Sequence, residues 1–261
     1  MVAVLAAAAA TVAFAQSAPQ HTLSFDIGAK PLKLSRPGKP VGLTLRLRMS
    51  LEEITAARVM QVDRMTFYLP ASKVNPDAFP HCTKEILRQQ GPTGCPPRSQ
   101  IGKGTATGDA TPLISRAYAD VFIFNGPRVE GKPTVLAWGK ARGVQVSATV
   151  VSTLTRTSGR YGIRVDTVIP AIPTVIGQPD ATVDGFDVQV GASIRKRGKL
   201  IHFAEAPVGC KPGGFHFRLR LDLSYHEITG AEPGDTFPGY PATGNPKDTV
   251  EDDAMIDCPS Y

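Results

Sequence analysis

The sequence predicts an all-β protein, an antiparallel β-sandwich of about ten strands with an extended, disulfide-tethered C-terminal tail. Apolar and polar residues alternate in one segment after another, as they do in half-buried strands. Turn formers separate these segments, because the 261 residues include 25 glycines and 23 prolines. Helical periodicity is scarce, and the repeating crossover helices of a parallel α/β sheet are therefore excluded.

Ten segments are expected to be strands. Alternation is clearest where one face is apolar and the other polar, as in residues 43–50, 161–169, 186–192 and 215–226. Six further strands are expected because they are short apolar runs bounded by turn residues: 23–27, 64–69, 101–109, 118–124, 134–139 and 144–154. Residues 76–90 are expected to carry one or two helical turns that end before Gly91.

The composition divides the chain into three parts: residues 1–15, a β-sandwich body at 16–229, and a tail at 230–261 rich in Gly, Pro and acids. Residues 1–15 are apolar and end in Ala13-Phe14-Ala15, which predicts a signal peptide cleaved before Gln16. The leader lacks a basic n-region, so a plain alanine-rich leader is the alternative. It is short for a membrane anchor, and the remaining sequence offers no second spanning segment. We therefore expect a secreted or cell-envelope protein without a transmembrane segment in the mature chain.

An exported chain with an even number of cysteines is expected to form disulfides. Three connectivities are possible for Cys82, Cys95, Cys210 and Cys258. We favour Cys82–Cys95, which closes a compact loop, and Cys210–Cys258, which ties the tail to the body. A four-cysteine zinc site is not expected, because the sequence contains no C-x2-C pair.

The net charge of +6 is an average over two unlike parts. Eight acids and one lysine after residue 226 give −7, which leaves +13 on the residues before it. Five arginines occupy polar positions of alternating strands and would form an anion-binding stripe if those strands are neighbours. They are Arg46, Arg48, Arg164, Arg218 and Arg220. The alternative is an ordinary solvated strand face. We also hypothesise that the acidic tail covers the face that bears Arg218 and Arg220.

No local motif predicts catalysis or a cofactor. Residues 102–108 resemble a glycine-rich phosphate loop, but a helix is not expected after them, so a glycine-rich strand is preferred. The histidines lack metal-ligand spacing, and the C-terminal acids lack the ligand pattern of a calcium loop, so no metal is expected and the tail is expected to be solvated. Few aromatic residues accompany the basic positions, which argues against nucleic-acid binding.

The segment from Phe79 to Gly126 contains a C-x12-C-P-x2-S-x-I-G-x-G-x-A core followed by Phe122-Ile123-Phe124-Asn125-Gly126. This core resembles that of an uncharacterised family of exported actinobacterial β-rich proteins. The resemblance covers less than half of the chain. It implies a secreted β-rich protein and carries no catalytic residues over.

We therefore expect an exported, non-catalytic protein that binds an anionic glycan, another envelope polymer or a protein partner through its basic strand face. The alternative is a secreted carbohydrate-active hydrolase whose paired carboxylates converge only in three dimensions. Candidates for such a pair are Asp120, Asp166, Asp184 and Asp187.

Overall fold

The structure, a computed structural model, describes residues 21–54, 60–144, 146–172, 174–175, 180–210, 212–224 and 247–259. The predicted signal peptide and the tail up to residue 246 lie outside the described residues. The strands are β1 (His21–Lys30), β2 (Thr44–Glu53), β3 (Gln61–Leu69), β4 (Lys73–Val74), β5 (Gln100–Ala110), β6 (Ile114–Val129), β7 (Lys132–Ala141), β8 (Ser147–Arg156), β9 (Ile163–Val168), β10 (Thr182–Val190), β11 (Ser193–Lys196), β12 (Lys199–His202), β13 (Ala204–Glu205), β14 (Phe215–Ser224) and β15 (Lys247–Ile256). One α-helix, α1 (Lys84–Gln90), lies between two 3-10 turns, η1 (Pro76–Ala78) and η2 (Pro92–Gly94).

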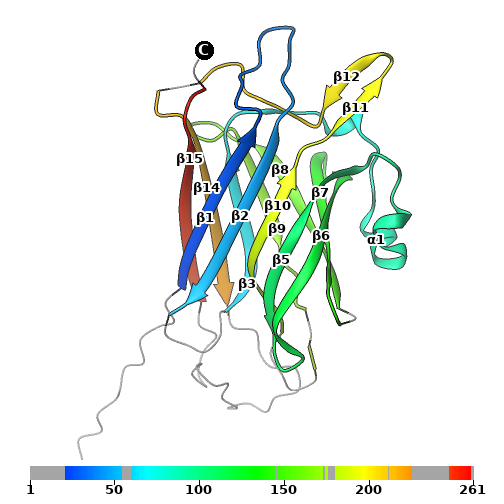
Figure 1. The fold of residues 1–261 in the computed structure, drawn as a ribbon, viewed down its shortest axis with the longest axis vertical. Coiled ribbons are helices and arrows are strands. Elements are labelled where there is room, and N and C mark those ends of the chain that lie inside the picture. Colours follow the sequence, from blue (N-terminus) through cyan, green and yellow to red (C-terminus); the bar gives the residue numbers. More distant parts are fainter. Residues whose placement is uncertain are drawn as a thin grey trace, which may run out of the picture.

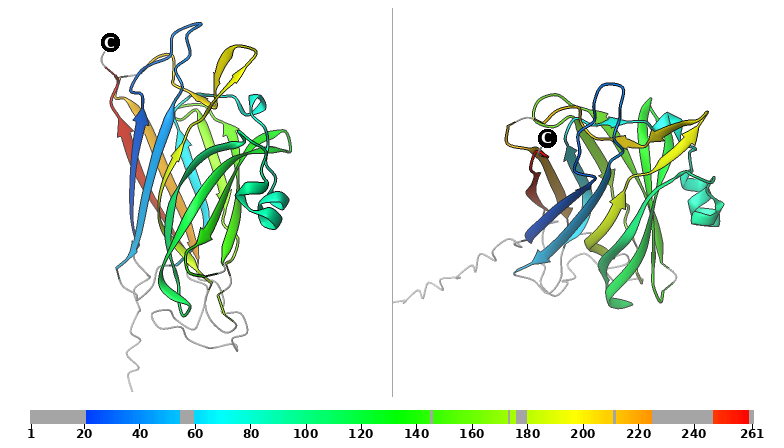
Figure 2. Two further views of the ribbon diagram at one scale, coloured as in Figure 1. Left: turned by 45° about the vertical axis from the view of Figure 1, so that its right-hand side comes forward. Right: turned by 45° about the horizontal axis from the view of Figure 1, so that its top comes forward.

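Eleven strands form one antiparallel sheet in the order β1-β2-β10-β5-β6-β7-β8-β9-β3-β14-β15. The sheet rolls up until its two edge strands, β1 and β15, lie side by side, so the molecule is a cylinder of strands (Figures 1 and 2). The predicted antiparallel all-β fold is confirmed, and each of the ten predicted strands coincides with a strand of this sheet. The two layers expected of a sandwich are opposite walls of a single rolled sheet.

Carboxylate side chains of β15 bridge the seam between β1 and β15. The backbone N–H of Phe25 on β1 donates to Oδ2 of Asp252 on β15, with 2.7 Å between the two atoms. Nearer the start of both strands, Nδ1 of His21 lies 3.0 Å from Oδ2 of Asp248. Two carboxylates on β15 thus satisfy polar groups along the exposed edge of β1, which would otherwise be open to pairing with another chain.

Large apolar side chains fill one half of the cylinder. β1, β2 and β14 direct Phe25, Met49, Leu51, Leu219 and Leu221 inward, and all five are buried. β15 completes this core, because Val250, Ala254 and Ile256 pack against it. The expected tail therefore ends in an edge strand with a core face, and the sequence reading overlooked the apolar residues that alternate with the acids of β15.

Both favoured disulfides are confirmed. Cys210–Cys258 joins the segment before β14 to the second residue after β15, with 5.8 Å between the Cα atoms. Cys82–Cys95 brackets α1, with 5.2 Å between the Cα atoms. In the described part of the chain, no helix has the length and apolar character needed to cross a membrane.

The helix α1 lies against the outside of the cylinder, next to β6, β7 and β8 (Figures 1 and 2). Its N-cap is Thr83, whose hydroxyl accepts from the backbone N–H of Ile86, and it ends at Gly91 as expected. The buried side chain of Leu87 packs with the first disulfide and with the outward-facing Phe124, Leu136 and Trp138. β6 and β7 are therefore apolar on both faces, since their outer face is covered by α1.

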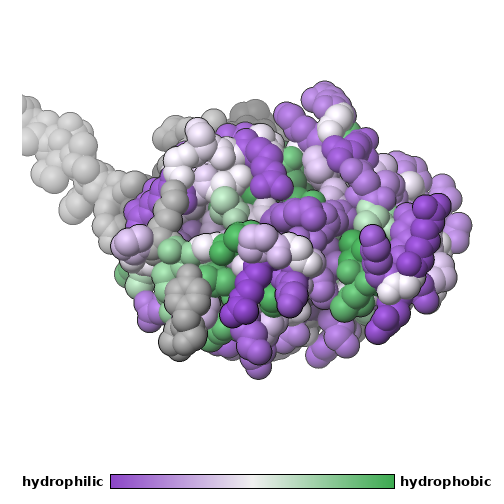
Figure 3. Space-filling view, turned by 90° about the horizontal axis from the view of Figure 1, so that it is seen from above, coloured by the Kyte–Doolittle hydropathy of each residue, from purple (hydrophilic) through white to green (hydrophobic). Residues whose placement is uncertain are grey.

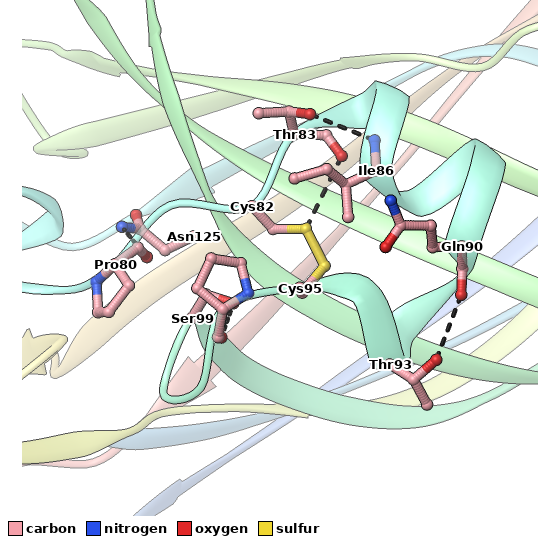
Figure 4. The surroundings of a disulfide bond; sticks show 10 residues. Pro80, Cys82, Thr83, Ile86, Gln90, Thr93, Cys95, Ser99 and Asn125 are labelled. Atoms are coloured by element: carbon pink, nitrogen blue, oxygen red, sulfur yellow. Dashed lines mark hydrogen bonds between the residues drawn. A yellow bond between two sulfur atoms is a disulfide. The ribbon is translucent and has the colours of Figure 1, made fainter.

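A buried asparagine fastens the α1 segment to the sheet. Nδ2 of Asn125 donates to the carbonyl oxygens of Pro76, Phe79 and Pro80 at 3.0–3.3 Å. The backbone carbonyl oxygen of the same residue accepts a hydrogen bond from the N–H of Cys82, and its backbone N–H donates to the carbonyl oxygen of Ser99. Figure 4 shows Asn125 and Ser99 beside the Cys82–Cys95 disulfide. Asn125, one of the residues of the core described from the sequence, thus fixes the segment before α1 to β6.

Candidate functional site

The strongest candidate for a functional site is an apolar cavity inside the rolled sheet. Its volume is about 350 Å³, and its lining comes mainly from inward-facing residues of β2, β3 and β5 to β10. Pockets that hold small molecules usually have volumes of roughly 300–1,000 Å³ and mostly apolar linings. Val74, Phe203 and Ala204 line one end of the cavity, and the last residues of β5 and the turn that follows β7 line the other.

The cavity exists because the inner faces of β5, β6 and β7 carry very small side chains. In one row of the sheet, Ala106 pairs with Ala119, and Ala119 pairs with Ala141. In a neighbouring row, Gly104 pairs with Val121, which pairs with Gly139. Apart from Val121, these two rows contribute only backbone and methyl groups to this wall.

Two glycines of this wall serve different purposes. A Cβ atom added to Gly104 would lie 2.1 Å from the carbonyl oxygen of Asp187, so this glycine allows β5 and β10 to approach closely. A Cβ atom added to Gly139 would meet nothing within 4 Å, so this position opens onto free space. The glycine-rich segment 102–108 is therefore a strand, as preferred over the phosphate loop, and it forms part of the cavity wall.

Larger side chains on the opposite wall complete the lining. Leu45 and Leu47 come from β2, Met65 from β3, and the rings of Phe67 and Phe186 lie 6.1 Å apart between centroids. These side chains separate the cavity from the filled half of the cylinder. The lining is therefore mostly aliphatic, with aromatic rings on one side.

Few polar groups reach the cavity. The hydroxyls of Ser152 on β8 and Thr167 on β9 are 2.7 Å apart and buried. Since two hydroxyls share one hydrogen bond, one hydroxyl proton stays available to a bound molecule. Asp109 is the ionisable residue of the described lining, and its carboxylate accepts from the backbone N–H of Thr111 in the adjacent turn. The cavity is suited to an apolar molecule with at most a few hydrogen-bonding groups.

The five arginines of the predicted anion-binding stripe form two sets. Arg164 and Arg218 lie in one row of the sheet, on either side of Tyr68, and Arg220 belongs to the next row of the same face. Arg46 and Arg48 lie on β2, which is separated from β14 by β1 and β15. The stripe is therefore interrupted by the seam.

Each of these arginines is paired with a carboxylate. Arg46 donates to Asp187, Arg48 lies 3.1 Å from Asp26, and Arg164 lies 2.7 Å from Asp166. On β14, Arg218 contacts Asp253 and Glu251, and Arg220 contacts Asp222 and Glu251. An anionic ligand would have to displace these partners, and binding through this set remains a prediction.

Two of these contacts show where the described part of the acidic tail lies. Asp253 accepts from Nε and Nη2 of Arg218 at 2.8 Å, and these hydrogen bonds lower the pKa of the Asp253 carboxyl. Arg218 also donates to Glu251 at 3.0 Å. Two acids of β15, Glu251 and Asp253, thus pair with Arg218 and Arg220 while their own side chains stay exposed to solvent.

The four carboxylates considered for a hydrolase do not line the cavity. Hydrogen bonds from Arg142 and Arg46 lower the pKa values of Asp120 and Asp187, respectively. A glycosidase general acid needs a raised pKa. Asp166 pairs with Arg164, and Asp184 accepts from the hydroxyl of Thr107. This arrangement gives no support to the hydrolase reading.

Sequence reasoning did not identify the cavity, although one signal was present. From 102 to 110, Gly or Ala occupies every second position, and Ala117, Ala119, Ala137 and Ala141 follow the same spacing on the next two strands. Alternating small residues on three neighbouring strands predict an unfilled wall, provided that the register between them is known.

Metal binding has no candidate in the described ranges, where no cluster of three His, Cys, Asp or Glu side chains is placed to hold an ion. No protein-family model, curated protein or solved structure matches this chain.

Proposed function

We propose that the protein is an exported, non-catalytic binding protein that holds an elongated apolar molecule, such as an aliphatic chain, inside the rolled sheet. The observation that carries the proposal is the interior cavity of about 350 Å³ with its almost wholly apolar lining. Apolar cavities of this kind exclude water and bind apolar molecules. The leader sequence and the two disulfides support export, because disulfides persist in oxidising compartments. The resemblance to exported actinobacterial proteins points the same way.

The volume limits the size of the ligand. A methylene group takes up about as much space as a water molecule, roughly 30 Å³, so a chain of roughly a dozen carbons would fill the cavity. Burial of each methylene contributes about 0.8 kcal/mol, or roughly 9 kcal/mol for the whole chain. Association costs at least about 4 kcal/mol, which leaves a dissociation constant of roughly 100 µM before any polar contact is added.

A chain-length series tests the proposal. Saturated fatty acids and the corresponding primary alcohols, from eight to eighteen carbons, are titrated into the disulfide-bonded protein while a fluorescent apolar probe is displaced. We expect an affinity maximum near twelve carbons for both series, because the aliphatic chain rather than the carboxylate fills the cavity. An affinity that rises steadily with chain length would indicate adsorption to the surface, and absence of displacement would overturn the proposal.

A further inference from the structure

One end of the cylinder carries a group of cations, and the neighbouring acid Glu205 is paired with Lys73 rather than with any of them. The connection between β1 and β2 and the β11–β12 hairpin both lie at this end, which is the upper end in Figures 1 and 2. Residues 30–43 and 191–203 contain eight basic residues and no acidic residue. We call these eight the cationic end: Lys30, Lys33, Arg36, Lys39, Arg195, Lys196, Arg197 and Lys199.

The cationic end differs from the arginines on the strands in its pairing. All eight residues are exposed, and none has a carboxylate partner among the described residues. By contrast, Arg46 and Arg218 each pair with an acid on a neighbouring strand. The positive charge that is available to an external partner is therefore concentrated at this end.

Hydrogen bonds join the two basic segments through the strand between them. The backbone N–H of Leu43 donates to Ala204 O at 2.9 Å, and that of Ser35 donates to Pro207 O at 3.0 Å. The β11–β12 hairpin is fixed to the same region, because Phe203 N–H donates to Ala192 O at 2.8 Å. The eight cations thus belong to one connected surface.

Apolar side chains protrude from this surface. Leu32 is 58 % exposed, Leu200 is 49 % exposed and Val208 is 62 % exposed. Leu32 lies between two of the lysines, and Leu200 follows the basic tip of the hairpin. Figure 3 views the molecule from this end, where hydrophilic residues predominate and hydrophobic residues reach the surface in separate patches.

We propose that the cationic end docks onto the surface of an anionic lipid bilayer. Basic side chains near an anionic leaflet are each attracted to it, and apolar side chains beside them gain by entering the boundary between headgroups and acyl chains. A hydrophilic polyanion would satisfy the cations but offer nothing to Leu32, Leu200 and Val208, so a bilayer fits the surface better. The proposal does not depend on what the cavity holds.

Vesicle flotation tests the docking proposal. The disulfide-bonded protein is mixed either with vesicles of pure phosphatidylcholine or with vesicles in which about a third of the lipid is the anionic phosphatidylglycerol. We expect binding only to the anionic vesicles, and weaker binding as salt is raised. Changing Arg195, Lys196, Arg197 and Lys199 together to Ser should lower the partition coefficient about a thousand-fold, at about 1 kcal/mol for each basic residue.

A matched variant separates this local effect from net charge. Lys84, Arg88, Lys103 and Lys140 are exposed cations on α1, β5 and β7, away from the cationic end. Changing these four to Ser alters the net charge by the same amount, and we expect the variant to bind within about two-fold of the parent protein. Equal losses in the two quadruple variants would overturn the proposal.

The apolar contribution decides between a bilayer and a soluble polyanion. The double variant Leu32→Ser/Leu200→Ser retains every cation, and for a bilayer partner it should lose about ten-fold or more in vesicle binding. Its retention on immobilised dextran sulfate should be unchanged. Parental vesicle binding by this variant, together with salt-sensitive retention on dextran sulfate, would identify a polyanion as the partner and refute bilayer docking. Circular dichroism and intact disulfides verify that each variant is folded.

Discussion

Replacing Ala119 by leucine tests whether the interior of the cylinder is empty. Ala119 is flanked by Ala106 and Ala141 in the same row of the sheet, and all three residues line the cavity. Leucine adds three carbon atoms, whose burial contributes about 2.4 kcal/mol at 0.8 kcal/mol each. Fixing the leucine side chain costs about 0.5–1 kcal/mol of rotamer entropy. The free energy of unfolding should therefore rise by about 1.5 kcal/mol, whereas the same change in a filled core would lower it by about 1–3 kcal/mol.

The same substitution should weaken ligand binding. Three added carbons occupy roughly 90 Å³, about a quarter of the cavity. A chain that fills the parental cavity would lose the burial of about three methylenes, or about 2.4 kcal/mol, which corresponds to roughly 50-fold weaker binding. The preferred chain should become shorter by about three carbons.

Urea denaturation and the chain-length titration measure the two effects on the same protein preparations. Thr105→Leu provides the matched control, because Thr105 is exposed and pairs with Asp120 on the outer face of the neighbouring strand. The control should leave both the chain-length optimum and the affinity unchanged. Destabilisation by Ala119→Leu, or an unchanged optimum in that variant, would refute the reasoning that space is left beside the alanines.

Three further predictions concern the wall and the seam. Asn125→Asp places a carboxylate against three carbonyl oxygens. The free energy of unfolding should fall by about 3 kcal/mol or more at pH 7 but by less at pH 5. Urea unfolding at the two pH values measures both losses, and equal losses would contradict the prediction. Gly104→Ala should destabilise the protein by about 1–3 kcal/mol because the added Cβ meets a backbone oxygen, whereas Gly139→Ala should be neutral or stabilising by up to about 1 kcal/mol. Thermal unfolding compares the two variants, and similar losses of stability would refute the inference that Gly139 faces free space. Since Arg218 lowers the pKa of Asp253 below its ordinary 3.8, the stability from this pair is present above that pH and lost as the pH falls through the folded-state pKa. Asp253→Asn should therefore cost at most about 1 kcal/mol at pH 7 and less as the pH falls through the folded-state pKa, and a cost that grows with acidity would contradict the sign.

The alternation of residues was sufficient to predict ten of the eleven strands of the sheet, because it depends only on which face is buried. The first disulfide followed from the short loop between Cys82 and Cys95, and the second from the need to fix a tail. Strand order was not accessible, since β10 inserts between β2 and β5 and β3 inserts between β9 and β14. These two crossovers place strands that are distant in the sequence side by side in one continuous sheet.

The candidate site could be predicted only in part. Periodicity correctly put Arg164, Arg218 and Arg220 on one polar face, but their partners depend on cross-strand register. β15 was overlooked because its acids outweighed the alternating Val250, Ala254 and Ile256. The cavity was overlooked for the same kind of reason, because an alanine every second residue is ordinary in one strand and leaves an empty space only when three such strands are adjacent.

The seam has a consequence for how the chain reaches its native state. Asp252 and Phe25, which meet across it, are 227 residues apart in the sequence. Contacts of such large separation are reached late, because closing the long intervening loop costs entropy before any contact is made, and folds rich in them form slowly. The pairing of β1 with β15 across the seam must therefore wait until the final strand has been synthesised. Until then, the edge of β1 lacks the two carboxylates of β15 that contact His21 and Phe25 in the native state.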